Sequence, residues 1–144
     1  WMREMVFPEG FSYVGGEIVP QLVGSLSRKY ARPGVDFIHF DITRGDFPQA
    51  DVWLCRDCLF HFSFADIHRA LANFVRADLP YALITNHFGD FENTDIPTGE
   101  FRLLDLTKPP FNLPIPTVRL RDYEHHKREV CLWSKTDIAA ALHG

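Results

Sequence analysis

Two short apolar runs on either side of an amphipathic segment constrain the fold most strongly. Residues 51–55 (DVWLC) and 81–85 (YALIT) are almost continuously apolar, which is typical of strands buried on both faces of a parallel sheet. Between them, apolar residues recur every three or four positions over residues 63–76, which predicts a helix. Ser63 suits the N-cap of that helix, and Asp66 stands where a capping box has its acid. The segment therefore predicts two parallel, neighbouring strands connected by a helix.

The same alternation begins earlier in the chain. Residues 11–18 (FSYVGGEI) and 35–42 (VDFIHFDI) are typical of strands. Pro20 suits the first turn of a helix between them, and Pro33-Gly34 would end that helix. Strands that alternate with helices predict an α/β fold with a mostly parallel sheet.

The last third of the chain has a different pattern. Residues 88–116 contain five prolines and little periodicity, which predicts a long irregular segment of the kind that often forms lids or binding loops. Two strand-like segments, 117–123 and 129–134, flank a polar link. They predict a C-terminal antiparallel hairpin beside the parallel strands. Thr136 or Asp137 is expected to cap a final helical turn.

Composition excludes several classes of protein. The chain has 144 residues, which fits a single domain, 1–144. Its net charge is −4 and its Lys and Arg residues do not cluster, so we expect no nucleic-acid partner. No apolar run reaches the length of a membrane span, and we expect no membrane partner. Three cysteines are too few for a disulfide scaffold, so we expect a cytoplasmic location.

Residues at the carboxyl ends of the predicted strands are the first candidates for a site, because ligands of open α/β sheets bind there. These positions hold Glu17, Asp41 and the segments 55–57 and 85–87. An acidic side chain at such a position can accept hydrogen bonds from ribose hydroxyls or from an adenine amino group. Glu17 and Asp41 could instead merely cap the segments that follow them.

Three phrases in order carry a family resemblance: residues 13–20 (YVGGEIVP), 37–42 (FIHFDI) and 50–62 (ADVWLCRDCLFHF). Together they resemble the class I S-adenosylmethionine-dependent methyltransferases over about Phe11 to Trp133. The resemblance implies a Rossmann-like methyltransferase fold and S-adenosylmethionine as cofactor. The cofactor-binding residues that it implies are Glu17, Ile18, Asp41, Ile42, Cys55 and Arg56.

The family's glycine-rich loop after its first strand has no counterpart here. Residues 1–5 (WMREM) resemble the start of the helix that follows that loop. We therefore expect the chain to be N-terminally truncated, without the family's central first strand. Segments 11–18 and 51–55 should then each have an unpaired edge. Such edges favour self-association, and cofactor binding by the isolated chain should be weak.

Rival motifs have simpler interpretations. Cys55-x-x-Cys58 followed by His61 could indicate zinc or redox chemistry, but no second paired motif supplies further ligands. We expect these cysteines to pack under the sheet, and we expect no metal. Residues 108–111 (KPPF) resemble the Asp/Asn-Pro-Pro-aromatic motif of amino-group methyltransferases, yet Lys108 replaces the acid or amide.

No catalytic residue can be assigned firmly from the sequence. The weak candidates are Asp57 and His61, and further histidines that could act as acids or bases are His87, His125 and His126. The sequence thus predicts methyl transfer to a small-molecule acceptor. The alternative is a non-catalytic methyltransferase-like module that acts through protein contacts. A strand and glycine loop encoded upstream would favour the enzyme.

Overall fold

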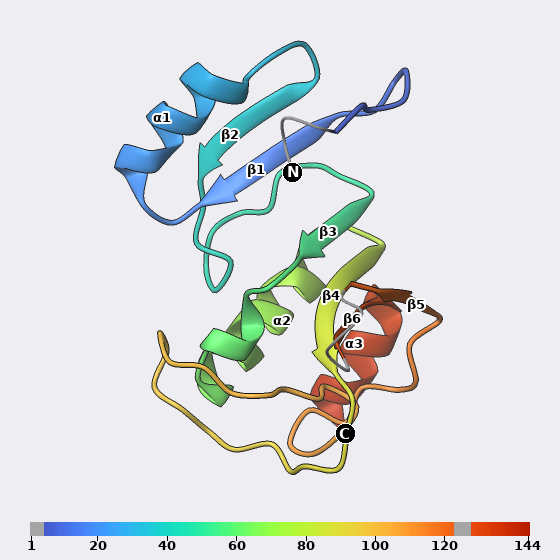
Figure 1. Cartoon of the computed structure of the whole chain (residues 1–144). Coiled ribbons are helices and arrows are strands. Elements are labelled where there is room, and N and C mark those ends of the chain that lie inside the picture. Colours follow the sequence, from blue (N-terminus) through green and yellow to red (C-terminus); the bar gives the residue numbers. More distant parts are fainter. Residues whose placement is uncertain (1–4, 123–127) are drawn as a thin grey trace.

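The computed structural model describes residues 5–122 and 128–144 (Figure 1). Along the chain the elements are β1 (Tyr13–Glu17), α1 (Pro20–Tyr30), β2 (Val35–His39), β3 (Val52–Cys55), the short 3-10 helix η1 (Leu59–His61), α2 (Phe64–Arg76), β4 (Tyr81–His87), β5 (Val118–Arg121), β6 (Arg128–Ser134) and α3 (Lys135–His143).

The strands form an α/β arrangement with a mixed sheet in two parts. β1 pairs with β2 in parallel, and the larger part has the strand order β3-β4-β6-β5. β3 and β4 are parallel neighbours, as predicted from their apolar runs. β6 lies antiparallel beside β4, and β5 antiparallel beside β6, so the predicted C-terminal hairpin is confirmed.

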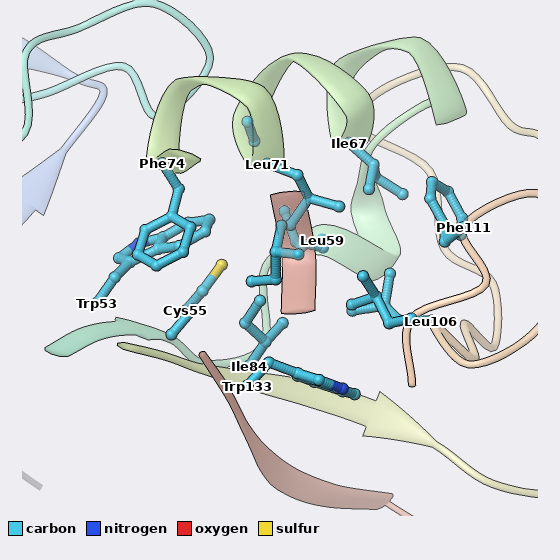
Figure 2. Packing of buried hydrophobic residues seen from close by; sticks show 14 of the residues in the cluster. Trp53, Cys55, Leu59, Ile67, Leu71, Phe74, Ile84, Leu106, Phe111 and Trp133 are labelled. Atoms are coloured by element: carbon cyan, nitrogen blue, oxygen red, sulfur yellow. The ribbon is translucent and has the colours of Figure 1, made fainter. Parts of the chain in front are cut away.

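The core lies between one face of the larger sheet and the two helices that cover it. Figure 2 shows side chains from α2 meeting those of the strands, among them Phe74 against Trp53 and Leu71 above Ile84. Ile138 brings α3 into the same cluster. Ser63 caps α2 by accepting a hydrogen bond from the N–H of Asp66 (3.2 Å), as predicted. Local capping and apolar periodicity therefore agree in placing this helix.

The opposite face of the larger sheet carries a row of aliphatic side chains. Leu54, Leu83, Leu132 and Val118 lie in register across the four strands. Leu54 is 44% exposed and Val118 is 40% exposed, while the two inner leucines are partly buried. No helix of the described residues packs on this row to the extent that α2 and α3 pack on the other face.

The two parts of the sheet face each other along open edges. The arrowheads of β1, β2, β3 and β4 point the same general way in Figure 1. Among the described residues no strand pairs with β3 on the side away from β4, or with β1 on the side away from β2. The sequence predicted these two unpaired edges from the missing first strand. Asn73 of α2 connects the parts by donating hydrogen bonds to the carbonyls of Ile42 (3.0 Å) and Gly45 (2.8 Å).

Residues 88–116 contain no helix or strand, as predicted, but they are not a loose loop. They place Leu104, Leu106, Phe111 and Leu113 in the hydrophobic core. At the end of β4, Asn86 accepts a hydrogen bond from the N–H of Leu106 (2.6 Å) and donates one to Asp105 (3.1 Å). The segment is thus fixed to the carboxyl end of the sheet by packing and by buried polar contacts.

Several predicted boundaries differ from the structure. β2 ends at His39 rather than near residue 42, because Asp41 begins a turn. The cap of α3 is Ser134, not Thr136 or Asp137, and Asp137 is instead the third residue of its capping box. α1 contains no buried residue, because it packs mainly on the two-stranded part of the sheet. The predicted helix at residues 1–5 lies almost entirely outside the described residues.

Candidate functional site

Glu17 stands at the carboxyl end of β1, where the sequence predicted it. Its Oε1 accepts a hydrogen bond from the N–H of Val19 (2.9 Å), the residue before α1. No other hydrogen bond to this carboxylate occurs among the described residues, so Oε2 is available to a ligand. Ile18 beside it is 55% exposed and presents an apolar surface next to the carboxylate.

Asp41 has a more local role than its neighbour on β1. Its Oδ1 accepts hydrogen bonds from the N–H (2.9 Å) and hydroxyl (2.7 Å) of Thr43, and its Oδ2 pairs with Nε of Arg44 (2.8 Å). The hydroxyl of Thr43, more than the charge of Arg44, lowers the pKa of Asp41. Ile42 is partly buried against the core. The turn is therefore built around Asp41, and a ligand would have to share its carboxylate.

The glycine pair of β1 is explained by aromatic packing. A Cβ on Gly15 would lie 2.5 Å from Cδ1 of Phe37, and one on Gly16 would lie 2.9 Å from Cδ1 of Phe40. Both positions thus lack a side chain because a ring occupies the space. These glycines do not replace the family's glycine-rich loop.

The carboxyl end of β3 holds three of the predicted residues in three different environments. Cys55 is buried in the core, so its side chain faces α2 and not the open edge of the sheet (Figure 2). Arg56 is exposed. Asp57 has a φ of 54°, in the left-handed region that non-glycine residues seldom adopt. The N–H of Asp57 donates a hydrogen bond to Oγ1 of Thr85 (2.8 Å), which stabilises this turn against β4.

Four charged residues form a closed ring at this end of the sheet. Arg56 donates to both oxygens of Asp122 at the end of β5 (Nη2 to Oδ1, 2.9 Å), and this contact raises the pKa of Arg56. Arg128 of β6 lies 3.4 Å from Asp122 and 3.3 Å from Oδ1 of Asp57, and Arg56 lies 3.9 Å from Oδ2 of Asp57. Asp57 is therefore paired with cations on both sides, which favours its ionised form.

His61, the second catalytic candidate, follows η1. Its Nδ1 lies 2.8 Å from the carbonyl oxygen of Glu100. Because a carbonyl can only accept, Nδ1 carries the hydrogen, and the neutral ring then has its lone pair at Nε2. The carbonyl of His61 also accepts the N–H of Gly99 (2.7 Å), so residues 99–100 hold the ring in place.

Other polar residues that build the site were not among the sequence candidates. Asn73 and Thr85 are buried, and each bonds to a turn that follows a strand. An asparagine on the apolar face of the predicted helix was a signal in the sequence for such a role. Arg102, also buried, donates from Nη1 to the carbonyl of Phe60 (3.0 Å) and so ties the irregular segment to η1.

Among the described residues, no three His, Cys, Asp or Glu side chains gather as a metal site would require. His125 and His126 lie outside the described residues. His87 is buried, and its Nδ1 accepts the N–H of Leu104 (3.3 Å), so it serves the irregular segment. No helix in the described part of the chain is both long and apolar enough to cross a membrane.

Comparison of the structure with solved structures gives similarity to methyltransferases. Human N-acetylserotonin methyltransferase, solved with S-adenosylmethionine, matches with a TM-score of 0.62 and 12% identity over 84% of this chain. The 1,6-didemethyltoxoflavin N1-methyltransferase of Burkholderia thailandensis matches with a TM-score of 0.58 and 16% identity, also over 84%.

The chain has the Rossmann-like fold of the S-adenosylmethionine-dependent methyltransferases. It spans 39% of the length of the human enzyme and 60% of the bacterial one. No family model matches the sequence, and no curated protein matches it. At these identities the likeness shows the fold, which confirms the fold class that the sequence resemblance implied.

Proposed function

We propose that this chain is part of an S-adenosylmethionine-dependent methyltransferase with a small-molecule acceptor. The observation that carries the proposal is the position of Glu17 at the carboxyl end of β1, with one carboxylate oxygen unused by the described residues. The ends of β3 and β4 lie on the same side of the sheet, with Asp57 and His61 just beyond β3. A ligand held by Glu17 would thus extend toward both catalytic candidates.

The described residues fit one end of the cofactor. Oε2 of Glu17 can accept a hydrogen bond from a ribose hydroxyl, and Ile18 offers an exposed apolar contact. Asp41 could accept the adenine amino group, since each carboxylate oxygen has a second lone pair. Cys55 and Arg56 could take part through their main chain, because their side chains are engaged elsewhere. No described residue offers the amides of a glycine loop to the methionine end.

When bound, the cofactor supplies an activated methyl group on sulfur. Transfer depends mainly on holding the acceptor in line with that group. Of the two candidates, His61 is better suited to remove a proton from the acceptor, because its Nε2 has a lone pair while Nδ1 is held by Glu100. Asp57 is paired with Arg128 and Arg56, so we propose that it helps to shape the site.

The open edges of β1 and β3 support a second part of the proposal. A strand from outside the described residues, parallel to both, would pair with each edge and join the two parts of the sheet. The loop after that strand would lie at the carboxyl ends, next to Glu17. We therefore propose that residues 1–144 are a truncated methyltransferase domain. The names of the two similar enzymes contain small-molecule acceptors, which supports that acceptor class.

A non-catalytic module is the second candidate function. The row of Leu54, Leu83, Leu132 and Val118 favours it, because exposed aliphatic side chains in register can bind another protein. Asp41, whose two oxygens are both bonded within its own turn, also fits a structural role. For either candidate we propose a reducing cytoplasm, in keeping with three free thiols at Cys55, Cys58 and Cys131.

Light scattering and titration calorimetry on the 144-residue chain and on the full-length coding product test the proposal. We expect the 144-residue chain to self-associate and to bind S-adenosylmethionine weakly, and the longer product to bind it well. A longer product that also fails to bind would favour the non-catalytic module. A monomeric 144-residue chain with tight binding would contradict the proposed strand.

A further inference from the structure

Cys55 and Cys58 lie against each other at the carboxyl end of β3. Their side chains are hydrogen-bonded to one another. Cys55 is buried in the core cluster, and Cys58 is partly buried against the same cluster. We propose that this pair is a modification site, which forms a reversible disulfide by exchange with a small-molecule disulfide such as oxidised glutathione. The inference is independent of the proposed function.

The backbone between the two cysteines explains why their side chains meet. Asp57 takes a left-handed conformation (φ 54°) directly before Cys58. The hydrogen bond from its N–H to Thr85 holds that turn against β4. A disulfide needs Cβ atoms about 4 Å apart and a suitable dihedral angle. Thiols that already share a hydrogen bond need side-chain rotation to form one, without a new fold of the chain.

The two thiols differ in the way that exchange requires. Cys58 is the more exposed, and the hydrogen bond from Cys55 lowers its pKa. The same hydrogen bond, together with burial, raises the pKa of Cys55. Cys58 is therefore the attacking thiolate, and Cys55 is the thiol that completes the exchange.

The exchange proceeds in two balanced steps. The thiolate of Cys58 attacks one sulfur of oxidised glutathione, so a mixed disulfide forms and one glutathione leaves as a thiolate. Cys55 then loses its proton, and its sulfur attacks that of Cys58, which releases the second glutathione. The two protein thiols lose two electrons and two protons in total, and one glutathione disulfide becomes two glutathione thiols.

The third cysteine is an internal control. Cys55 lies opposite Ile84, and Ile84 lies opposite Cys131, so two strand spacings separate the cysteines. That separation is about 10 Å, beyond the roughly 7 Å between Cα atoms that a disulfide can bridge. Burial also raises the pKa of Cys131 to about 12. Cys131 should therefore stay reduced while the other two react.

The test is to equilibrate the purified chain in glutathione buffers of increasing oxidised fraction, quench with acid, alkylate under denaturing conditions and map the peptides by mass. We expect a species lighter by two hydrogen atoms, with Cys55 and Cys58 joined and Cys131 alkylated, that dithiothreitol reverses. Cys131→Ser should behave like the wild type, and Cys58→Ser should form no bridge.

Two results would overturn the inference. One is a stable glutathione adduct on Cys58 while Cys55 remains alkylated. The other is complete alkylation of all three cysteines at every buffer composition. If Cys58→Ser does not fold, the wild-type peptide map still decides, because it assigns each sulfur without a variant.

Discussion

The N–H of Asp57 donates a hydrogen bond to the hydroxyl of Thr85 over 2.8 Å, and so connects the turn after β3 to the strand beside it. Thr85 is 1% exposed, so water cannot replace the lost contact freely. The strained turn carries Asp57 and Cys58 to their places at the carboxyl edge. One buried hydroxyl thus supports both the candidate site and the proposed thiol pair.

Replacing Thr85 by Val should leave the N–H of Asp57 without its partner. We expect the free energy of unfolding to fall by about 1–3 kcal/mol, the usual cost of an unsatisfied buried donor. Amide exchange at Asp57 should become faster, because that N–H loses its acceptor. Thr85→Ser is the matched control, since it keeps the hydroxyl and should keep Asp57 protected. Equal exchange rates at Asp57 in the Val and Ser variants would contradict this role.

Asp66 should make the stability of the chain sensitive to acid. Its pKa is lowered from 3.8, first by the hydroxyl of Thr98 and then by Arg69. A carboxyl whose pKa is lower in the folded state stabilises the protein fully above its unfolded pKa. That stabilisation is lost as the pH falls from about 3.8 through the lower, folded pKa.

Urea unfolding of Asp66→Asn at neutral pH and at pH values below 4 checks this sign. We expect the variant to be less stable than the wild type at neutral pH, with the difference shrinking in acid. Asp90→Asn, a change at an exposed carboxyl in the irregular segment, is the control. A difference that stays constant down to the lowest pH would show that Asp66 acts through packing and not through its charge.

Self-association of the 144-residue chain should depend on the larger sheet. Leu54 is 44% exposed on the open-edged strand β3, while Leu22 is 48% exposed on α1. We expect Leu54→Lys to reduce the associated mass in light scattering, because a charge on an edge strand opposes pairing with another chain. Leu22→Lys should have little effect. Equal effects of both changes would place the association elsewhere.

The parts of the fold that were predictable depend on local patterns. The apolar runs of β3 and β4 and the helical spacing of α2 predicted their pairing, because burial on both sides leaves a clear pattern in one short segment. Ser63 was predictable as a cap for the same reason. The cap of α3 was not, because Ser134, Thr136 and Asp137 are all suitable residue types and the end of β6 decides among them.

The candidate site was less predictable, because its contacts join distant segments. Asp57 meets Arg128, Arg56 meets Asp122, and His61 meets Glu100, and no local pattern reports such pairs. The core residues of the irregular segment were missed for a related reason. Leu104 and Leu106 lie in extended backbone fixed by Asn86 and His87, where no helical or strand periodicity is required.

The affinity of the full-length coding product for S-adenosylmethionine, compared with that of its Glu17→Ala variant, tests the central claim most directly. Loss of a hydrogen bond to a charged group costs about 1.5–3 kcal/mol, so calorimetric titration should show a dissociation constant about ten-fold higher or more. Glu92→Ala removes an exposed carboxylate in the irregular segment and should leave the affinity unchanged. Unchanged affinity in Glu17→Ala would mean that Glu17 only caps α1 through Val19, and would contradict the account.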